Sequence, residues 1–213
     1  MMSARSSETP YEAAVAVLAA GREALRGERD AIERSSQVLG DDFVRAVELI
    51  VHCPGKVVVT GLGKSGHVGV KIAATLSSVG SPAFFVHSGE ALHGDSGALG
   101  KGDVLIALSN SGRTAETVAL ARYAATLGVE VISIVGVPDS PLAQLSAAVL
   151  DASVEREADP LGLAPTASTT VAMAIGDALA AAAMTVDKFT PADFHARHPS
   201  GSLGEDLAPK VRP

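Results

Sequence analysis

Short hydrophobic runs alternate with segments of helical periodicity over most of the chain. The runs, rich in β-branched residues, predict strands over 56–60, 82–87, 103–109, 129–135 and 148–153. Hydrophobic residues recur at helical spacing over 67–79, 114–127, 140–147 and 168–184. Strands that are hydrophobic throughout and alternate with helices are typical of a parallel sheet covered on both faces. The pattern therefore predicts an α/β fold, a three-layer α/β/α sandwich around a five-stranded parallel sheet.

The N-terminal segment has a different pattern. Thr9 and Glu12 have the spacing of a capping box, and hydrophobic residues then recur at roughly helical spacing as far as Leu39. A second helix is predicted after Gly40 and Asp41. The long hydrophobic stripe of these helices indicates contact with a partner subunit. The predicted organisation is an N-terminal helical arm over 1–52 within the same domain, the functional domain over 53–205, and a tail over 206–213.

Composition narrows the classes of function. The 213 residues are 47% hydrophobic and 3% aromatic, with a net charge of −7 and no cluster of Lys or Arg. This composition excludes a disordered chain and argues against nucleic acid or an anionic membrane as a partner. The single Cys53 excludes a disulfide framework and suits a reducing cytoplasm.

No segment predicts export or a membrane anchor. The N-terminus is polar and lacks the hydrophobic region of a signal peptide. The longest hydrophobic stretch, 171–184, is interrupted by Asp177 and is shorter than the roughly 20 residues that a membrane span needs. We therefore expect a cytoplasmic protein.

The loops that follow the predicted strands carry the candidate chemistry, because ligands of open parallel sheets bind beyond the carboxyl ends of the strands. After the first strand, Gly61, Gly63 and Gly66 have the spacing of a dinucleotide-binding loop, but the acidic residue expected after the second strand is missing. The glycines fit either a tight strand-to-helix turn or an anion site. Lys64 favours the anion site, since a cation beside a helix N-terminus suits an anionic ligand.

Residues with hydroxyl groups begin two later helices. Ser109, Ser111 and Thr114 follow the third strand, and a second cluster occupies 166–170. Such residues either form a phosphate cradle of N–H and O–H donors or simply cap the helix. Capping needs only one hydroxyl, which favours the anion site. Two such clusters in one sheet predict a site that holds a sugar phosphate from two sides.

Titratable residues outside these loops have several interpretations. His87, Glu90, His93 and Asp95 lie close together after the second strand and fit metal ligands, acid–base groups or a solvated loop. The remaining candidates, which by default are surface residues, are Glu116, Glu157, His195 and His198.

Taken together, these loops resemble the sugar isomerase (SIS) domain family, and within it the D-arabinose-5-phosphate isomerases. The segments that carry the resemblance are 61–67, 84–95, 109–112, 160–170 and 198–204, and it spans about residues 15–205. The resemblance implies a flavodoxin-like SIS fold. It also implies reversible interconversion of D-ribulose 5-phosphate and D-arabinose 5-phosphate through an enediol, the first step toward the lipopolysaccharide sugar Kdo.

The resemblance further implies roles for individual residues and partners. The residues implied as catalytic are Lys64, Glu116, Glu157, His198 and His93. Those implied to bind substrate are Gly63, Ser65, Gly80, Ser81, His87, Ser109, Asn110, Ser111, Thr114, Thr166 and Ser168. No cofactor is implied, and zinc at His87 would inhibit rather than assist. The implied partners are the sugar phosphate and further copies of the chain, in a homotetramer whose sites are completed across subunits.

The chemistry assigns these residues to particular steps. Aldose–ketose isomerisation needs a base for the carbon acid and a group that stabilises charge on the oxygens. We hypothesise that Glu157 or Glu116 transfers the proton while Lys64 polarises the carbonyl. His93 or His198 would assist ring opening, and the hydroxyl clusters would hold the phosphate.

Two features depart from the subgroup. Its members usually continue into a pair of CBS domains, whereas this sequence ends at Pro213. Arg113 occupies a position that is commonly Glu, and it would strengthen phosphate binding or shift the preference among sugars. The alternatives to the pentose phosphate isomerase are a non-catalytic phosphosugar sensor and an isomerase of a hexulose or heptose phosphate. The block around His87 favours the pentose phosphate isomerase.

Overall fold

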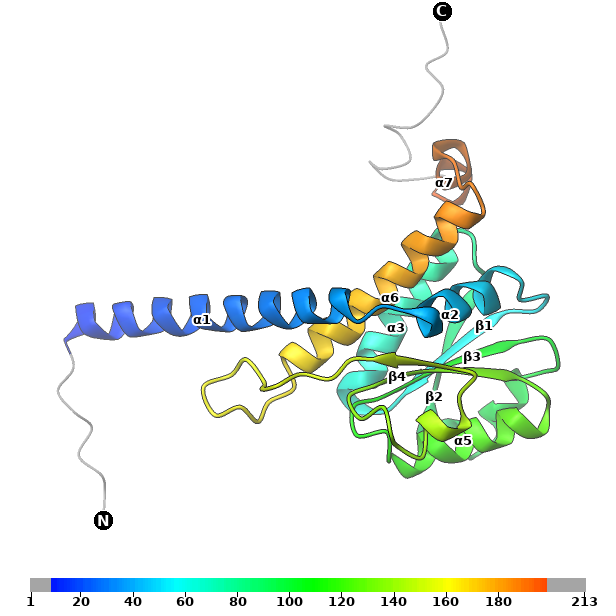
Figure 1. Cartoon of the computed structure of the whole chain (residues 1–213), viewed down its shortest axis with the longest axis horizontal. Helices are drawn as coiled ribbons and strands as arrows, with labels where there is room; N and C mark the ends of the chain where they lie inside the picture. Colours follow the sequence, from blue (N-terminus) through cyan, green and yellow to red (C-terminus); the bar gives the residue numbers. More distant parts are fainter. Residues whose placement is uncertain (1–8, 199–213) are drawn as a thin grey trace, which may run out of the picture.

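The computed structural model describes residues 9–198 of the chain. Its centre is a five-stranded sheet with the order β2-β1-β3-β4-β5, in which all neighbouring strands are parallel (Figure 1). The strands are β1 (Val57–Gly61), β2 (Ala83–His87), β3 (Val104–Ser109), β4 (Glu130–Val135) and β5 (Ala148–Asp151). This strand order is flavodoxin-like. The predicted fold class is confirmed, and the predicted tail over 206–213 lies outside the described residues.

Helices cover both faces of the sheet. On one face lie α2 (Asp41–Val51), α3 (Gly63–Ser78) and α6 (Ala167–Val186), with α1 (Pro10–Gln37) packed across α6. On the other face lie α4 (Ser88–Ala91) and α5 (Ala115–Thr126), and the short α7 (Pro191–Arg197) follows α6. Each face has its own hydrophobic core, so the central strands are buried on both sides.

The predicted N-terminal arm is helical. The Thr9 hydroxyl accepts from the Glu12 N–H at 3.3 Å, and the Glu12 carboxylate accepts from the Thr9 N–H at 2.9 Å, which completes the capping box. The end of α1 packs on α6 and buries Ala31, whereas its beginning projects away from the sheet (Figure 1).

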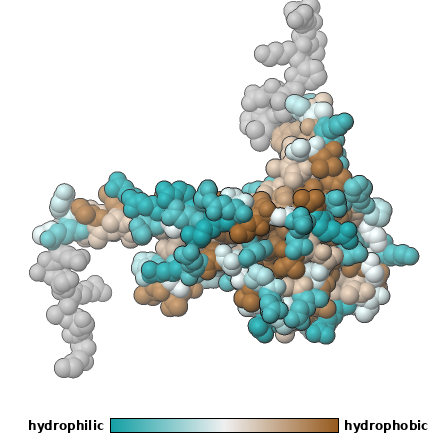
Figure 2. Space-filling model, viewed as in Figure 1, coloured by the Kyte–Doolittle hydropathy of each residue, from teal (hydrophilic) through white to brown (hydrophobic). Residues whose placement is uncertain are grey.

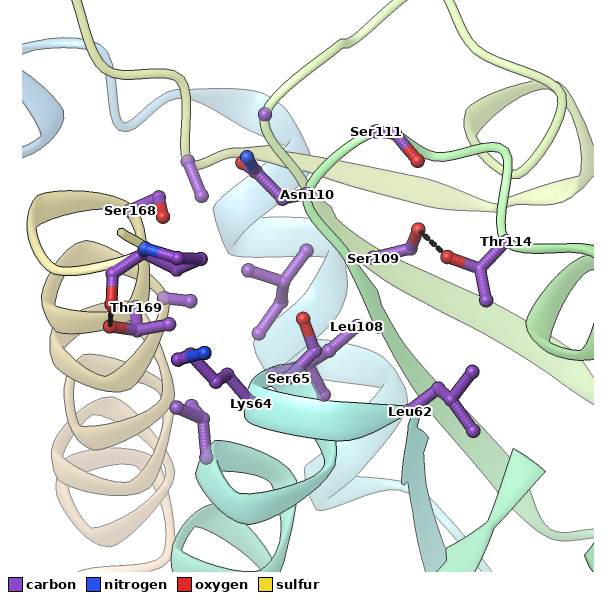
Figure 3. Close-up of a pocket in the computed structure, with 16 residues that line it drawn as sticks. Leu62, Lys64, Ser65, Leu108, Ser109, Asn110, Ser111, Thr114, Ser168 and Thr169 are labelled. Carbon is purple, nitrogen blue, oxygen red and sulfur yellow. Dashed lines mark hydrogen bonds between the residues drawn. The ribbon is translucent and has the colours of Figure 1, made fainter. Parts of the chain in front are cut away.

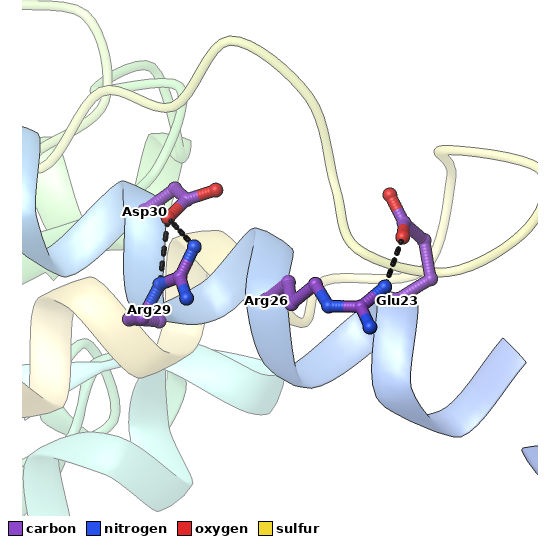
Figure 4. Close-up of polar contacts among 4 residues, drawn as sticks. All are labelled: Glu23, Arg26, Arg29 and Asp30. Atoms are coloured by element: carbon purple, nitrogen blue, oxygen red, sulfur yellow. Dashed lines mark hydrogen bonds and ion pairs between the residues drawn. The ribbon is translucent and has the colours of Figure 1, made fainter. Parts of the chain in front are cut away.

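The projecting part of α1 has both polar and hydrophobic exposed residues. Ion pairs join Glu23 to Arg26 and Arg29 to Asp30 (Figure 4). Polar residues dominate the visible side of α1 (Figure 2). The exposed large hydrophobic residues on α1 are Tyr11, Val15, Val17, Leu18, Leu25 and Ile32. A helix whose hydrophobic residues remain exposed in the monomer has a surface suited to contact with another chain.

Two connections differ from the prediction. The segment 140–147 is not an α-helix and contains only a 3-10 turn, Ala143–Leu145. Its hydrophobic residues mimic helical spacing, but the Leu142 N–H donates to the Gly112 carbonyl at 3.1 Å and ties the segment to the loop after β3. The loop expected after β2 instead contains α4 and a 3-10 turn, Asp95–Ala98.

Helix α6 is longer than the hydrophobic stretch noted in the sequence. Among the described residues it is the one helix whose length and composition would suffice to cross a membrane. Its packing, however, is that of a core helix: it contacts α1, α2 and α3, and its Asp177 forms an ion pair with Lys71 of α3. At Gly176 the two helices approach so closely that a Cβ would lie 2.3 Å from Ile72 Cγ1.

Candidate functional site

A pocket of about 370 Å³ opens at the carboxyl edge of the sheet, between the starts of α3 and α6 (Figure 3). Of its 16 lining residues, Lys64 is the one with a charged side chain. The predicted site residues that line it are Lys64, Ser65, Ser109, Asn110, Ser111, Thr114 and Ser168. The structure therefore brings together residues from three separate loops.

The strand order explains the position of this pocket. β1 and β3 are neighbours, with Gly61 opposite Leu108. The chain leaves β1 toward α3 on one face of the sheet and leaves β3 toward α5 on the other. Loops that diverge from adjacent strands leave a crevice at the topological switch point, where ligands of such sheets bind.

The loop after β1 combines a tight turn with an open helix start. A Cβ on Gly61 would lie 3.0 Å from the Ser65 carbonyl oxygen, and Gly63 has a φ of 57°, so the turn requires these glycines. No side chain caps α3 at Leu62. The N–H groups of its first turn are therefore available to a ligand beside Lys64. Lys64 extends from this turn toward the start of α6 (Figure 3).

The loop after β3 is held by a contact between its own hydroxyl groups and by contacts with Gly136, which follows β4. The Ser109 and Thr114 hydroxyls lie 2.9 Å apart, and Thr114 makes no capping bond to α5. The Gly136 N–H donates to the Asn110 carbonyl at 2.9 Å, and a Cβ on Gly136 would lie 2.2 Å from Asn110 Oδ1. Because Thr114 does not cap the helix, the start of α5 also remains available to an anion.

The start of α6 differs from the prediction, because Glu157 occupies it. One Glu157 carboxylate oxygen accepts from the Thr166 N–H at 2.8 Å and from the Ser168 N–H at 3.1 Å, and the other accepts from the Ser168 hydroxyl. Burial alone would raise the pKa of Glu157, but the hydrogen bonds from Ser168 and Thr166 outweigh it and hold the pKa below its usual range.

This contact changes the roles expected of Glu157 and of the hydroxyl cluster at the start of α6. The Thr166 hydroxyl also accepts from the Ala158 N–H at 2.8 Å, so Thr166 stabilises the loop and does not line the pocket. A carboxylate with a lowered pKa and several donors is a weak base. In this structure Glu157 holds the start of α6, and the second predicted phosphate cradle is filled by the chain's own carboxylate.

Several predicted residues lie at the same edge without lining the pocket. His87 ends β2 opposite Gly61, Glu116 lies in the first turn of α5, and His93 is exposed after α4. Gly63 adjoins the pocket-lining Leu62 and Lys64. Between residues 9 and 198, no three His, Cys, Asp or Glu residues are grouped as metal ligands, around His87 or elsewhere.

Three predicted residues lie away from the pocket, at the amino edge of the sheet. Gly80 and Ser81 precede β2, and a Cβ on Gly80 would lie 3.7 Å from Arg197 of α7. His198 ends α7, where its ring stacks on Phe194 with a centroid distance of 3.9 Å. Within one chain, then, these three residues do not join Lys64: Gly80 and Ser81 precede a strand, and α6 carries α7 with His198 to the opposite edge (Figure 1).

The pocket also includes residues that were not among the predicted site residues. Gly136 directly follows β4 and Pro165 precedes α6, while Thr169 belongs to the predicted hydroxyl cluster over 166–170 but was not singled out within it. Gly136 follows the carboxyl end of a central strand, so the rule that located the other loops would also have found it.

The fold and the pocket define a doubly wound α/β domain with a ligand site at its switch point. The SIS domain profile matches residues 50–182, and the chain belongs to this family. The arabinose 5-phosphate isomerase KdsD of Pseudomonas aeruginosa is 55% identical over 184 residues, which cover 86% of this chain and 56% of the relative. The arabinose 5-phosphate isomerase GutQ of Escherichia coli K12 is 50% identical over 196 residues, covering 92% and 61%.

A solved structure extends the likeness to three dimensions. The protein c3406 of Escherichia coli CFT073, in complex with arabinose 5-phosphate, has a TM-score of 0.83 at 40% identity and covers 87% of this chain and 98% of that chain. The chain described here spans less than two thirds of the length of the KdsD and GutQ relatives.

Proposed function

We propose that the chain is an aldose–ketose isomerase that interconverts D-ribulose 5-phosphate and D-arabinose 5-phosphate in the cytoplasm, as a supply of Kdo precursor. The observation that carries the proposal is the pocket lined by Lys64 at the open start of α3 and by the hydroxyl groups beside the open start of α5. Its volume of about 370 Å³ suits a small phosphorylated sugar. The names of the KdsD and GutQ relatives, and the arabinose 5-phosphate complex of c3406, favour this sugar among others.

The phosphate is assigned to the α5 side of the pocket. The Ser109, Ser111 and Thr114 hydroxyls lie there beside the open start of α5, and Ser65 and the open start of α3 face them. N–H groups at helix starts favour a dianion. We do not assign phosphate to the α6 start, since Glu157 already occupies it. Anchoring the phosphate positions the sugar carbons for proton transfer.

The proton transfer is assigned to Glu116. In the direction from the aldose, a base removes the C2 proton, an enediol forms, and a proton is returned to C1, so that the carbonyl moves from C1 to C2 without a change in atoms. Lys64 stabilises the negative charge that develops on the oxygens. Glu116 is preferred to Glu157 as the base because the latter is held by hydrogen bonds with a lowered pKa. His93 and His198 would move protons on oxygen.

We propose that the chain acts as a homo-oligomer, with the tetramer as the expected state. The amino-edge group of Gly80, Ser81 and His198 would then complete the pocket of another copy. The exposed hydrophobic residues of α1 support this proposal. So does the loop after β5, where Leu161 and Leu163 are 78% and 76% exposed. The arm over 1–52 would mediate assembly and the unit over 53–205 would carry the reaction.

The function is tested by incubating the purified chain with pentose, hexulose and heptose phosphates and following isomerisation with coupled assays. We expect turnover of the D-arabinose 5-phosphate and D-ribulose 5-phosphate pair, unchanged by a chelator. Turnover of another sugar phosphate alone would reassign the substrate. Thermal stabilisation by a sugar phosphate without any turnover would identify a sensor instead. Activity that is lost with the chelator and restored by zinc would overturn the metal-free mechanism.

The shared site is tested by mixing two single variants. Lys64→Ala and His198→Ala are each expected to be nearly inactive. After subunit exchange at equal concentrations, about a quarter of the sites would combine an intact Lys64 from one chain with an intact His198 from another. We therefore expect activity to recover to about a quarter of the parent value. Recovery would be absent if both residues served a site within one chain.

A further inference from the structure

Three buried hydroxyl groups form a continuous hydrogen-bonded chain close to the site. Thr60 on β1, Ser88 in α4 and Thr117 in α5 are each 0% exposed. The Thr60 hydroxyl oxygen lies 2.7 Å from the Val86 carbonyl oxygen and 3.0 Å from the Ser88 hydroxyl oxygen. The Ser88 and Thr117 hydroxyl oxygens also lie 3.0 Å apart. These side chains therefore connect β1, β2, α4 and α5.

The direction of each hydrogen bond follows from the chemistry of the groups. A carbonyl oxygen can only accept, so Thr60 donates its single hydroxyl proton to Val86. Thr60 must then accept from Ser88, and Ser88 in turn accepts from Thr117. All three hydroxyl protons are used in one ordered series. Such a series fixes the distances between its members more narrowly than hydrophobic contacts do, because each bond has a preferred length and angle.

The neighbours of these hydroxyls in the sequence are candidate site residues. His87 lies between Val86 and Ser88, both of which belong to the series. Glu116 immediately precedes Thr117 in the first turn of α5. The contact between α4 and α5 is thus made next to both candidates.

We infer that the hydroxyl chain of Thr60, Ser88 and Thr117 is a positioning device for catalysis. It fixes Glu116 and the segment after β2 relative to β1, whose following loop carries Lys64. The inference rests on the isomerase function proposed above. The three are positioning residues and not catalytic ones, since none lines the pocket. A displacement of about 1 Å between reacting groups can cost a hundredfold in rate, so a chain of this kind has a large effect on turnover.

Ser133 on β4 provides a matched comparison. It is also 0% exposed, but within the described chain its hydroxyl has no hydrogen-bond partner. Removing the Ser133 hydroxyl deletes a buried polar group without breaking a hydrogen bond in the described chain. Removing the Thr117 hydroxyl deletes a group of the same kind and also breaks the hydrogen bond that links the series to α5. The difference between the two variants therefore isolates the hydrogen-bonded chain.

The test compares Thr117→Val, Thr117→Ser and Ser133→Ala in the isomerase assay. Thr117→Val keeps the side-chain shape, and we expect its kcat to fall by about tenfold to a hundredfold while KM changes by less than about threefold. Thr117→Ser retains the donor and is expected to keep kcat near the parent value. Ser133→Ala is expected to leave both constants unchanged. If Thr117→Val does not fold, Ser88→Ala interrupts the same series and replaces it.

Two results would overturn the inference. One is a Thr117→Val enzyme with parental kcat, and the other is an equal loss of kcat in Ser133→Ala. Amide hydrogen exchange keeps the test separate from the proposed function. If the parent turns over no sugar phosphate, the function fails, but Thr117→Val is still expected to speed exchange of the hydrogen-bonded amides of α4 and α5 by about tenfold. Unchanged exchange there would show that the series positions nothing.

Discussion

Replacing Lys64 with alanine is expected to lower kcat/KM for D-arabinose 5-phosphate by about a thousandfold. Lys64 is the one charged side chain among the residues that line the pocket. Its loss removes both the attraction for the phosphorylated substrate and the stabilisation of charge on the enediol oxygens. Because that charge develops in the transition state, most of the effect is expected in kcat and less in KM. Steady-state kinetics of the purified variant give both values.

Lys71→Ala is the matched control for this variant. Lys71 is a second lysine of α3, but it pairs with Asp177 of α6 and does not line the pocket. A half-exposed ion pair contributes little to stability, so we expect a folded protein with parental kinetics. A Lys64→Ala enzyme that kept the parental kcat would remove this residue from the mechanism. Equal losses in both variants would point to a general effect of charge on α3.

Gly112→Ala is expected to reduce the free energy of unfolding by about 3 kcal/mol or more and to abolish turnover. Gly112 has a φ of 61°, and an added Cβ would lie 1.9 Å from the Ser140 hydroxyl oxygen and 2.4 Å from Ser140 Cβ. Ser140 is fully buried, so it has no space into which to move. The backbone of the loop after β3 would shift instead. Urea unfolding and the isomerase assay measure the two effects.

Gly128→Ala is the control that separates the effect of backbone strain from the effect of the steric clash between the added Cβ and Ser140. Gly128 has a φ of 71°, similar to that of Gly112, but an added Cβ there meets nothing within 4 Å. We expect this control to lose only about 1 kcal/mol and to retain activity. In Gly112→Ala, a further Ser140→Gly substitution is expected to restore part of the lost stability. Equal destabilisation by the two alanine substitutions would contradict the predicted collision.

Much of the fold could be predicted from the sequence because parallel strands buried on both faces leave a simple signal. The run from Val57 to Val59, for example, is hydrophobic at every position and fully buried. The capping box of Thr9 and Glu12 could also be predicted, because its two residues are close together in the sequence. The structure of the segment 140–147 could not be predicted in this way. Its hydrophobic spacing suited a helix, but it is held by a contact with Gly112, a distant residue in the sequence. Local periodicity does not contain that information.

The part of the candidate site that could be predicted consists of residues in loops that directly follow the carboxyl ends of strands. Lys64, Ser109 and Thr114 come after the carboxyl ends of neighbouring strands, and these residues line one pocket. Gly80 and Ser81 come before a strand, so their position at the opposite edge was already contained in the sequence pattern. The location of His198 depends on the path of α6 and α7 in space, which spacing alone does not determine.

The contact between Glu157 and the start of α6 has a consequence for the stoichiometry of anion binding. The Glu157 carboxylate places its negative charge at the N–H groups of Thr166 and Ser168. Without Glu157, a second phosphoryl group could supply that charge. The start of α6 thus already holds an internal counter-anion and leaves no place there for an external one. We therefore expect a sugar bisphosphate to gain no second anchor at the start of α6 and to meet repulsion from Glu157, so that the proposed site would select against doubly phosphorylated sugars.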